Sequence, residues 1–379
     1  MRANFCTRIH RGDNRHGRIP PDCFRMSERF SGTIEVQERQ RFDEATLGRW
    51  FTQQVDESAA RSFRISQFKG GQSNPTFLAE TALVRYVVRR KPAGVLLPSA
   101  HAVEREFRVM RALRDTDVPV PEVHALCEDP SVIGTTFYVM AFVDGRVLWD
   151  PHLPGASADE RAAICDEMNR VLAALHNIDP EAVGLSDYGR PGNYMGRQVD
   201  RWSKQYRASE TEPIDAMERL IQWLPAHLPP QATTTIVHGD YRLDNLVFAH
   251  DAPRVVAVLD WELSTLGDPM ADFAYHCMAW HLAPPFRGLA DLDAGAVAEL
   301  GLPTEEAYVA AYARRRRLPP VDPVHWRAYM AFNLFRAAAI AQGIMGRALA
   351  GNASNAHALE AGQQARELAE LGWAQVAQD

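Results

Sequence analysis

The stretch IVHGDYRLDNLVF, residues 236–248, places several polar side chains between two apolar runs. The apolar runs predict two short strands, and Gly239 permits a bend between them. Turn chemistry explains part of the pattern, because Asp and Asn bond to their own backbone in tight turns. A turn does not, however, require an imidazole and two carboxylates together. The polar side chains are His238, Asp240, Arg242, Asp244 and Asn245.

A second apolar run, VVAVLD at residues 255–260, ends in Asp260. If this run pairs with the strand after Asn245 as a hairpin, Asp260 returns beside the 238–245 turn. Asp240, Asn245 and Asp260 would then share one pocket. Oxygen ligands of this kind suit Mg²⁺, which keeps several waters and shares its coordination sphere with substrate phosphates. The spacing therefore predicts a magnesium–phosphate site.

The composition is that of a globular protein that handles small molecules. The chain has 379 residues, 46% of them hydrophobic and 23% charged, and this length favours two or more lobes or domains. A net charge of −7 argues against nucleic acid as the main partner. No apolar run reaches the length of about 18 residues that a membrane span needs. The five cysteines form no C-x-x-C motif, which favours reduced thiols and a cytoplasmic location.

The predicted secondary structure changes near residue 142, from mostly strands to mostly helices, and indicates an α+β protein. Residues 1–40 are expected to be a disordered extension or a stretch that precedes the true start of translation. Residues 41–142 read as a small β-rich lobe that also holds a helix at 43–55 and another beginning near Ser99. Residues 143–379 read as a larger, mainly helical lobe. Its expected helices span 157–179, 194–209, 214–227 and 325–351, and a β-rich segment at 235–260 interrupts them.

The sequence HGDYRLDN … VLDWE resembles the signature of the aminoglycoside phosphotransferase and choline kinase family, distant relatives of protein kinases. The Asp-to-Asn spacing equals that of the protein-kinase catalytic loop, and the downstream Asp matches the one that binds magnesium there. Further stretches, such as LDWELSTLGDP and FNLFRAAAIAQGI, resemble a subgroup that includes the kinase-like domains fused to certain long acyl-CoA dehydrogenases. The resemblance covers residue 43 to the C-terminus. It implies a protein-kinase-like two-lobed fold and transfer of the γ-phosphoryl group of Mg-ATP to a substrate hydroxyl.

The resemblance also implies roles for single residues. Asp240 matches the catalytic aspartate, which accepts or orients the proton of the attacking hydroxyl, and Asn245 and Asp260 match the Mg²⁺ ligands. Phosphoryl transfer relies mostly on positioning and charge neutralisation, so supporting residues matter as well. The expected supporting residues are His238, Glu262, Asp268 and Asp272, with assistance to the metal as the alternative role of Glu262.

In the small lobe, FKGGQSN resembles a nucleotide-binding loop. Gly70 and Gly71 would let the backbone approach phosphate, and Ser73 or Asn74 would donate hydrogen bonds. The stretch FYVMAFVDG resembles the hinge between the lobes, where the backbone from Ala141 to Val143 would contact the base.

The cation that pairs with the α- and β-phosphates should lie at the end of the strand YVVRRK. Many relatives have Lys there, whereas this chain offers Arg89, Arg90 or Lys91. Because side chains alternate along a strand, Arg89 and Arg90 face opposite sides of the sheet, and alignment with the family favours Arg89. The expected carboxylate partner is Glu104 or Glu106 in the next helix, and the family spacing favours Glu106.

The acceptor is expected to be a small molecule that carries a hydroxyl. An aminoglycoside would require an acidic pocket for a polycation, but the helical half is rich in cations instead. These cations are Arg197, Arg201, Lys204, Arg207, Arg314–Arg317 and Arg336. The subgroup resemblance implies a hydroxylated acyl chain, such as a hydroxyacyl-CoA, with aminoglycosides as the alternative.

Two other functions remain open from the sequence. One is a metal-dependent hydrolase in which His238, Asp240 and Asp260 bind Zn²⁺ or Mn²⁺ directly. The other is a non-catalytic module that binds a nucleotide or an acyl-CoA. The hydrolase explains the H-x-D pattern but not the Gly-Gly hairpin, the strand cation or the helix Glu. The binding module is disfavoured because none of the groups that such kinases need is missing.

Overall fold

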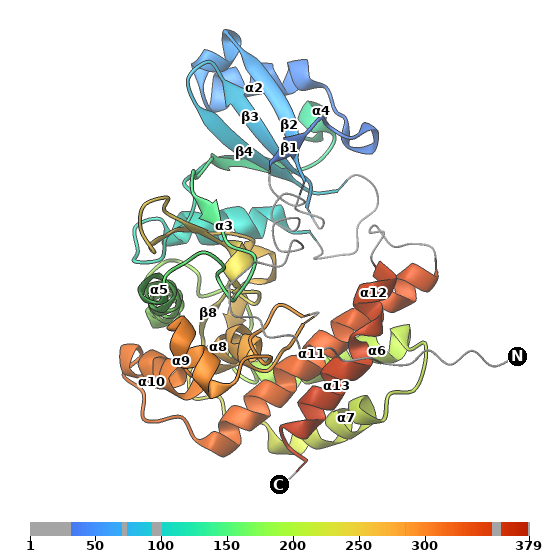
Figure 1. Ribbon diagram of the computed structural model, residues 1–379. Helices are drawn as coiled ribbons and strands as arrows, with labels where there is room; N and C mark the ends of the chain where they lie inside the picture. The colour runs from blue at the N-terminus through green and yellow to red at the C-terminus, as the bar shows by residue number, and fades with distance from the viewer. Residues whose placement is uncertain (1–31, 70–73, 93–100, 285, 351–357, 378–379) are drawn as a thin grey trace, which may run out of the picture.

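The computed structural model describes residues 32–69, 74–92, 101–284, 286–350 and 358–377 and has two lobes (Figure 1). The N-terminal lobe is built on a six-stranded antiparallel sheet with the order β1-β2-β3-β4-β6-β5. Its strands are β1 (Thr33–Ile34), β2 (Phe63–Phe68), β3 (Thr76–Thr81), β4 (Arg85–Arg90), β5 (Val123–Cys127) and β6 (Phe137–Ala141). The larger C-terminal lobe is mainly helical, as predicted for an α+β protein.

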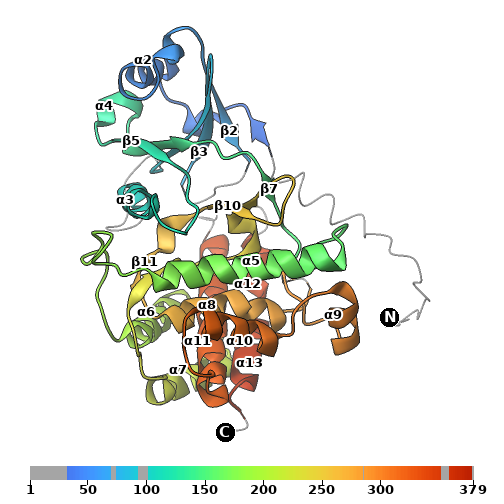
Figure 2. The same cartoon turned by 90° about the vertical axis from the view of Figure 1, so that its left-hand side faces the viewer.

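Helices cover both faces of this sheet. They are α2 (Glu44–Gln54), α3 (Val103–Leu113) and α4 (Pro130–Ile133). Val88 of β4 belongs to the buried cluster beneath α2 and α4, whereas Val87 belongs to the cluster that includes α3. In both views α3 lies between the sheet and the helical lobe (Figures 1 and 2). Because side chains alternate along β4, Arg89 faces α3 and the C-terminal lobe, and Arg90 faces α2.

Three expectations about this lobe change in detail. The first strand begins at Thr33, so the sheet includes residues that were assigned to the N-terminal extension. Helix α2 begins after Asp43, whose carboxylate caps it by accepting hydrogen bonds from the amides of Ala45 and Thr46. The residue proposed to cap the next helix, Ser99, lies outside the described residues, and α3 begins at Val103 without a side-chain cap.

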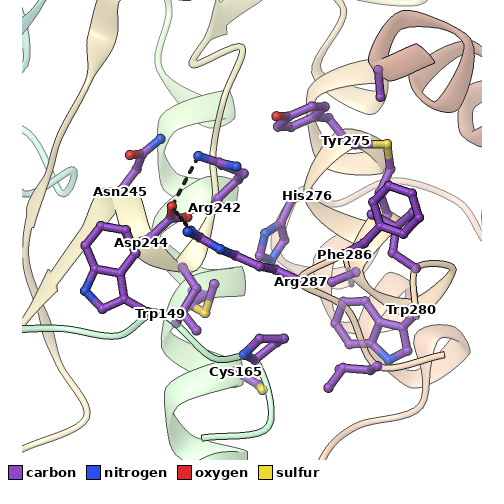
Figure 3. A pocket seen from close by; sticks show the side chains of 18 of the residues that line it. Trp149, Cys165, Arg242, Asp244, Asn245, Tyr275, His276, Trp280, Phe286 and Arg287 are labelled. Atoms are coloured by element: carbon purple, nitrogen blue, oxygen red, sulfur yellow. Dashed lines mark hydrogen bonds and ion pairs between the residues drawn. The ribbon is translucent and has the colours of Figure 1, made fainter. Parts of the chain in front are cut away.

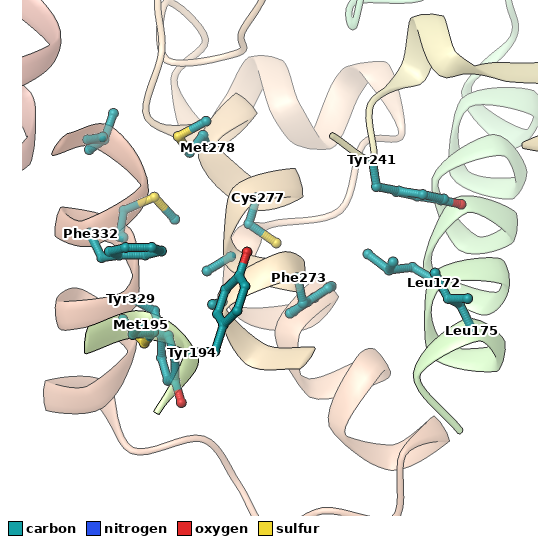
Figure 4. Packing of buried hydrophobic residues seen from close by; sticks show 14 of the residues in the cluster. Leu172, Leu175, Tyr194, Met195, Tyr241, Phe273, Cys277, Met278, Tyr329 and Phe332 are labelled. Atoms are coloured by element: carbon teal, nitrogen blue, oxygen red, sulfur yellow. The ribbon is translucent and has the colours of Figure 1, made fainter. Parts of the chain in front are cut away.

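Nine helices are described in the C-terminal lobe. They are α5 (Ala158–Asn177), α6 (Tyr194–Ser209), α7 (Asp215–His227), α8 (Pro269–Cys277), α9 (Ala294–Leu300), α10 (Glu305–Arg315), α11 (Pro323–Leu349), α12 (Ala358–Gln363) and α13 (Ala365–Ala374). Figure 4 shows Phe273 and Cys277 of α8 between side chains of α5 and α11, such as Leu172 and Phe332. Helix α8 therefore lies at the centre of this core, and its position is fixed by packing on several sides.

The long helix α11 begins and ends two residues earlier than predicted. Asp322 caps it by accepting a hydrogen bond from the Val324 amide, and Pro323 occupies the first turn, where no amide is needed. It ends at Leu349, and the predicted stop at Gly351 and Asn352 lies outside the described residues. Among the described residues, none of the helices combines the length and apolar character needed to cross a bilayer.

The stretch 236–248 forms a strand, a loop and a strand, as predicted, but the two strands belong to different sheets. Strand β8 (Thr235–Val237) pairs with β11 (Thr265–Gly267). Strand β9 (Leu246–Phe248) pairs with β7 (Arg146–Val147) and with β10 (Val255–Val258). The predicted β9–β10 hairpin is therefore present. Its register brings the Leu259 amide to the Asn245 carbonyl at 2.8 Å, so Asp260 follows directly beside the loop.

Candidate active site

A buried carboxylate holds the loop that joins β8 to β9. Asp272, in the first turns of α8, accepts hydrogen bonds from the amides of His238 at 2.7 Å and Gly239 at 2.8 Å. The Nε2 atom of His176, on α5, lies 3.1 Å from the same carboxylate. Burial pushes the pKa of Asp272 upward, but the hydrogen bond and charge of His176 outweigh it, so the pKa lies below its usual value. Asp272 is thus an anion that ties α5 and α8 to the loop.

Asp268 supports the same helix. It caps α8 by accepting hydrogen bonds from the amides of Met270 and Ala271, and Tyr329 of α11 donates to its other oxygen at 3.2 Å. Burial raises the pKa of Asp268, although these hydrogen bonds oppose the change. The carboxylate therefore fixes where α8 begins, four residues before Asp272.

The imidazole of His238 is used inside the loop. Its Nε2 atom bonds to the Leu259 carbonyl at 2.9 Å, and its Nδ1 atom accepts a hydrogen bond from the Asp240 amide at 3.2 Å. Both ring nitrogens therefore have partners in the fold. No group of three His, Cys, Asp or Glu residues in the described ranges could hold a metal ion. These contacts leave His238 no free ring nitrogen for Zn²⁺ or Mn²⁺, which the metal-dependent hydrolase left open by the sequence would require.

Three side chains orient the carboxylate of Asp240. Tyr275 of α8 donates a hydrogen bond to Oδ1 at 2.5 Å, and the Nε atom of Arg242 lies 3.2 Å from the same oxygen. The amide of Asn245 donates to Oδ2 at 3.0 Å and to the Asp240 carbonyl at 2.8 Å. Asp240 and Asn245 are therefore neighbours, as predicted, and the predicted hairpin places Asp260 on the adjoining strand end.

The backbone at Asp260 is left-handed, with φ at 62°. This conformation is uncommon for a residue other than glycine and is often found at functional sites. The residue begins a 3₁₀ helix, Trp261–Leu263, which is anchored where the buried Trp261 indole donates to the Val258 carbonyl at 2.9 Å. The anchor turns the Asp260 carboxylate toward the N-terminal lobe, where it meets Arg89.

Arg89 connects the two lobes. Its Nε atom lies 2.9 Å from Glu106 on α3, and its Nη2 atom lies 2.6 Å from Asp260 and 3.6 Å from Glu262. Burial lowers the pKa of Arg89, but the charges of Glu106 and Asp260 outweigh it, so the pKa rises and the group stays cationic. The lobes are therefore joined by an ion-pair network at the predicted magnesium ligand.

The other candidates for the phosphate cation have different partners. Arg90 donates to the Gln40 carbonyl at 3.0 Å and lies over the rings of Phe42 and Phe77 on the far face of the sheet. Lys91 pairs with Glu104 at 2.8 Å. The alternation along β4 was therefore interpreted correctly. Of these three cations, only Arg89 lies beside Asp260.

Asn74 has a different environment from the one expected of a phosphate-binding residue. Its side chain is fully buried and donates to Glu106 at 2.9 Å and to Glu262 at 3.4 Å. The amide therefore supports the carboxylates around Arg89 in this structure. The other predicted loop residues, Gly70, Gly71 and Ser73, lie outside the described residues.

At the hinge, the protein already uses two of the predicted backbone groups. The amide of Ala141 donates to the Glu122 carbonyl at 2.8 Å, and the amide of Phe142 donates to the Arg85 carbonyl at 3.3 Å. A base could therefore meet the carbonyl of Ala141 or the amide of Val143, but not the amide of Ala141.

A cavity of about 680 Å³ opens beside the loop (Figure 3). Its wall is mostly apolar and includes Trp149, Leu153, Met168, Met278, Trp280, Leu282, Phe286, Leu289, Tyr308 and Leu368. Asp244 accepts hydrogen bonds from Arg287 at 2.5 Å and from Arg242 at 3.2 Å, and the Arg287 guanidinium lies 5.1 Å from the centre of the Trp149 ring. Arg89, Asn245 and Asp260 border the same cavity.

None of the cations that were expected near the acceptor lines this cavity. Lys204 pairs with Asp200, and Arg315, at the end of α10, pairs with Asp166. The remaining members of the set do not line the cavity; they are Arg197, Arg201, Arg207, Arg314, Arg316, Arg317 and Arg336. The arginines that do line it are Arg89, Arg242 and Arg287. The cations of this cavity are therefore not the ones that were expected from the sequence.

Sequence patterns missed Tyr275 and Arg287, and they named Arg336 only as a cation for the acceptor and not for its contact with the loop. Tyr275 follows Asp272 by three residues, so both lie on one face of α8, and this spacing was the available signal. Arg287 lies in a loop, and its contact with Asp244 depends on the packing of that loop. Arg336 is buried on α11 and donates to the Gly239 carbonyl at 2.7 Å.

Comparison with known proteins identifies the family. Residues 64–316 match the model of the phosphotransferase enzyme family. Mouse acyl-CoA dehydrogenase family member 10 is 53% identical over 312 residues, which cover 82% of this chain and 29% of that protein. Human acyl-CoA dehydrogenase family member 11 is 39% identical over 347 residues, with 90% and 44% covered. The chain thus spans less than half the length of these curated relatives.

Solved structures show the same fold. The crystal structure of a "putative aminoglycoside phosphotransferase" from Ralstonia eutropha is 55% identical, with a TM-score of 0.80 over 89% of this chain and 99% of that one. An aminoglycoside phosphotransferase in complex with ADP and hygromycin B is 16% identical, with a TM-score of 0.58 over 88% of this chain and 99% of that one. Choline kinase from Cryptosporidium parvum is 12% identical, with a TM-score of 0.57 and 89% and 96% covered. The last two share the kinase-like fold alone. The chain belongs to the phosphotransferase enzyme family, as its loop motif predicted, and has that family's two-lobed α+β fold.

Proposed function

We propose that this phosphotransferase is a Mg-ATP-dependent small-molecule kinase that phosphorylates the hydroxyl of an acyl-type acceptor, such as a hydroxyacyl-CoA. The observation that supports the proposal is that Asn245 and Asp260 line a mostly apolar cavity while Asn245 also holds the Asp240 carboxylate. In this role, Asp240 orients the acceptor hydroxyl and accepts its proton as the bond to phosphorus forms.

The donor set at the loop suits magnesium. Asn245 offers an amide oxygen and Asp260 a carboxylate, and Mg²⁺ takes few protein oxygens because it keeps waters and binds substrate phosphates. We assign these two residues as its ligands, with Glu262 as a brace for Arg89. The ion, when bound, neutralises charge on the β- and γ-phosphates.

On the nucleotide side, we assign Arg89 to the phosphates of ATP, oriented by Glu106. A guanidinium binds phosphate as a fork rather than as a point charge, so the phosphates would meet two nitrogens instead of one. We also assign Gly70, Gly71 and Ser73, which lie outside the described residues, to the phosphates. The base would lie against the Ala141 carbonyl and the Val143 amide at the hinge.

The acceptor assignment follows from the charges that line the cavity. Its carboxylates, Asp244 and Asp260, are both paired with arginines. A polycationic aminoglycoside would need free carboxylates, whereas an acyl chain gains from burial against aromatic and aliphatic side chains. An anionic group on the acceptor would find Arg242 and Arg287 nearby. The names of the acyl-CoA dehydrogenase relatives agree with an acyl ligand.

The test is Mg-ATP turnover with a panel of hydroxyacyl-CoAs and a panel of aminoglycosides, with Asp240→Asn as the control variant. We expect phosphorylation of hydroxyacyl-CoAs and a loss of about 10²–10⁴-fold in kcat in the variant. Equal turnover by the wild type and Asp240→Asn would refute the catalytic assignment, whereas no turnover by the wild type on either panel would favour a non-catalytic binding module. Turnover confined to aminoglycosides would refute the acyl acceptor and favour an aminoglycoside O-phosphotransferase.

A further inference from the structure

Tyr275 lies where the acceptor cavity meets Asp240. Its side chain lines the cavity, and its hydroxyl donates to Asp240 Oδ1 at 2.5 Å. We propose that Tyr275, held by Arg336, is a positioning residue that fixes which oxygen of Asp240 faces the acceptor hydroxyl. The inference rests on the proposed function, because it gives Asp240 the role of accepting that proton.

The two oxygens of Asp240 are held by separate donors. Oδ1 lies against Tyr275 and Arg242, while Oδ2 accepts from Asn245. The donors come from α8 and from two later positions of the same loop, so the carboxylate cannot turn without losing a hydrogen bond. Tyr308, another tyrosine in the cavity wall, bonds instead to His276 at 2.7 Å. Tyr275 is therefore the cavity tyrosine placed to act on Asp240.

Arg336 holds the Tyr275 ring in place. Its guanidinium lies 4.9 Å from the centre of that ring and 5.9 Å from the centre of the Trp202 ring. Its Nη2 atom donates to the Gly239 carbonyl at 2.7 Å, in the same loop as Asp240. The side chain is buried on α11, so these contacts are shielded from solvent. Arg336 therefore couples the position of the tyrosine to the position of the loop backbone.

Helix α8 therefore positions both the backbone of the loop and the side chain of Asp240. Asp272 of α8 accepts the loop amides, and Tyr275, about one turn later, holds the side chain that acts on the acceptor. An interaction that orients a reacting group lowers the barrier by pre-organisation, and small misplacements can be costly in rate. A carboxylate freed from Tyr275 would align the acceptor hydroxyl less well, and water would compete for the phosphoryl group.

The experiment compares Tyr275→Phe with Tyr86→Phe. Tyr86 is a matched control because it is also buried and donates to an aspartate, Asp56, at 3.3 Å in the N-terminal lobe. We expect Tyr275→Phe to lower kcat for acceptor phosphorylation by about 10- to 100-fold with the KM for Mg-ATP unchanged. The share of ATP hydrolysed without acceptor phosphorylation should rise, whereas a general loss of structure would lower both reactions in parallel. Tyr86→Phe should change none of these quantities.

A second measurement needs no acceptor. Urea unfolding of Tyr275→Phe, Asp240→Asn and the double variant forms a cycle, and the shifts in the midpoint should be less than additive if the hydrogen bond is present. Additive shifts would refute the contact. A Tyr275→Phe enzyme with wild-type kcat and wild-type coupling of hydrolysis to transfer would refute the positioning role. If the wild type transfers no phosphoryl group to any acceptor, the proposed function fails, and the unfolding cycle still decides the contact.

Discussion

His276 makes the stability of the cavity wall depend on pH. It lies on α8, lines the cavity and bonds through Nε2 to the Tyr308 hydroxyl at 2.7 Å. Burial lowers its pKa from 6.5 to about 4, although a hydrogen bond with the Tyr241 backbone and the charge of Asp272 oppose the change. The folded protein therefore keeps His276 neutral at pH values where the unfolded chain protonates it.

The sign and size of the effect follow from proton linkage. Below pH 6.5 the unfolded state binds a proton that the folded state does not, so stability falls as the pH falls, until His276 titrates in the folded state near pH 4. Across the pH range between the two pKa values, the free energy of unfolding falls by about 3 kcal/mol in total, because each unit of pKa difference contributes about 1.4 kcal/mol. Between pH 7.5 and pH 5.5 the free energy of unfolding falls by about 1.3 kcal/mol. A folded-state pKa of about 5 for His276, instead of about 4, would barely change this value.

The assay is urea unfolding of the wild type and His276→Gln at pH 7.5 and pH 5.5. Glutamine can retain a hydrogen bond to Tyr308 but does not titrate in this range. We expect the wild type to lose about 1.3 kcal/mol more than the variant between the two pH values. Replacement of the exposed His227 by glutamine serves as the control and should leave the wild-type pH dependence in place. Parallel pH dependence in the wild type and His276→Gln would refute the reasoning.

Three further predictions concern the nucleotide site, the loop and the cavity. Arg89→Lys should raise the KM for Mg-ATP by about 10-fold, because an ammonium cannot reach Glu106 and Asp260 as a fork. Steady-state kinetics would measure this, with Arg90→Lys, on the far face of the sheet, as the control. The same KM for Mg-ATP in both variants would contradict the prediction. Asp272→Asn should lower the free energy of unfolding by about 3 kcal/mol in urea, since the loop amides and a buried histidine lose their anion, and an unchanged midpoint would disprove it. Ala337→Phe should raise the KM for the acceptor but not for Mg-ATP by filling the cavity, and equal changes in both KM values would argue against the cavity as the acceptor site.

The parts of the site that could be predicted from sequence depend on short-range regularities. The β9–β10 hairpin follows from two apolar runs with a short connection, and its pairing alone brings Asp260 to the loop. The distinction between Arg89 and Arg90 follows from the two-residue period of a strand. The family motif supplied the roles, but these local rules already determined which side chains could meet.

The parts that could not be predicted depend on how helices pack. Tyr275 and Arg287 reach the loop across 35 and 43 residues of sequence, and Arg336 reaches it across 97. No local pattern specifies these distances, because they follow from the burial of α8 and α11 in one core. The partners of Asn74 have the same origin. Its partner Glu106 lies 32 residues away on α3, and only the tertiary structure shows that this carboxylate uses the amide.

Membership of the family indicates the type of reaction more clearly than the identity of the acceptor. The described residues that we assign to phosphate and magnesium, from Arg89 to Asp260, lie within residues 64–316, which match the family model. The far wall of the cavity comes partly from beyond that range, because Ala337 of α11, Ala361 of α12 and Leu368 of α13 line it. Function resides in sites built onto a shared fold, and a wall formed outside the shared region can change its ligand without disturbing the catalytic loop. Substitutions in α11–α13 should therefore change acceptor preference while leaving the use of ATP intact.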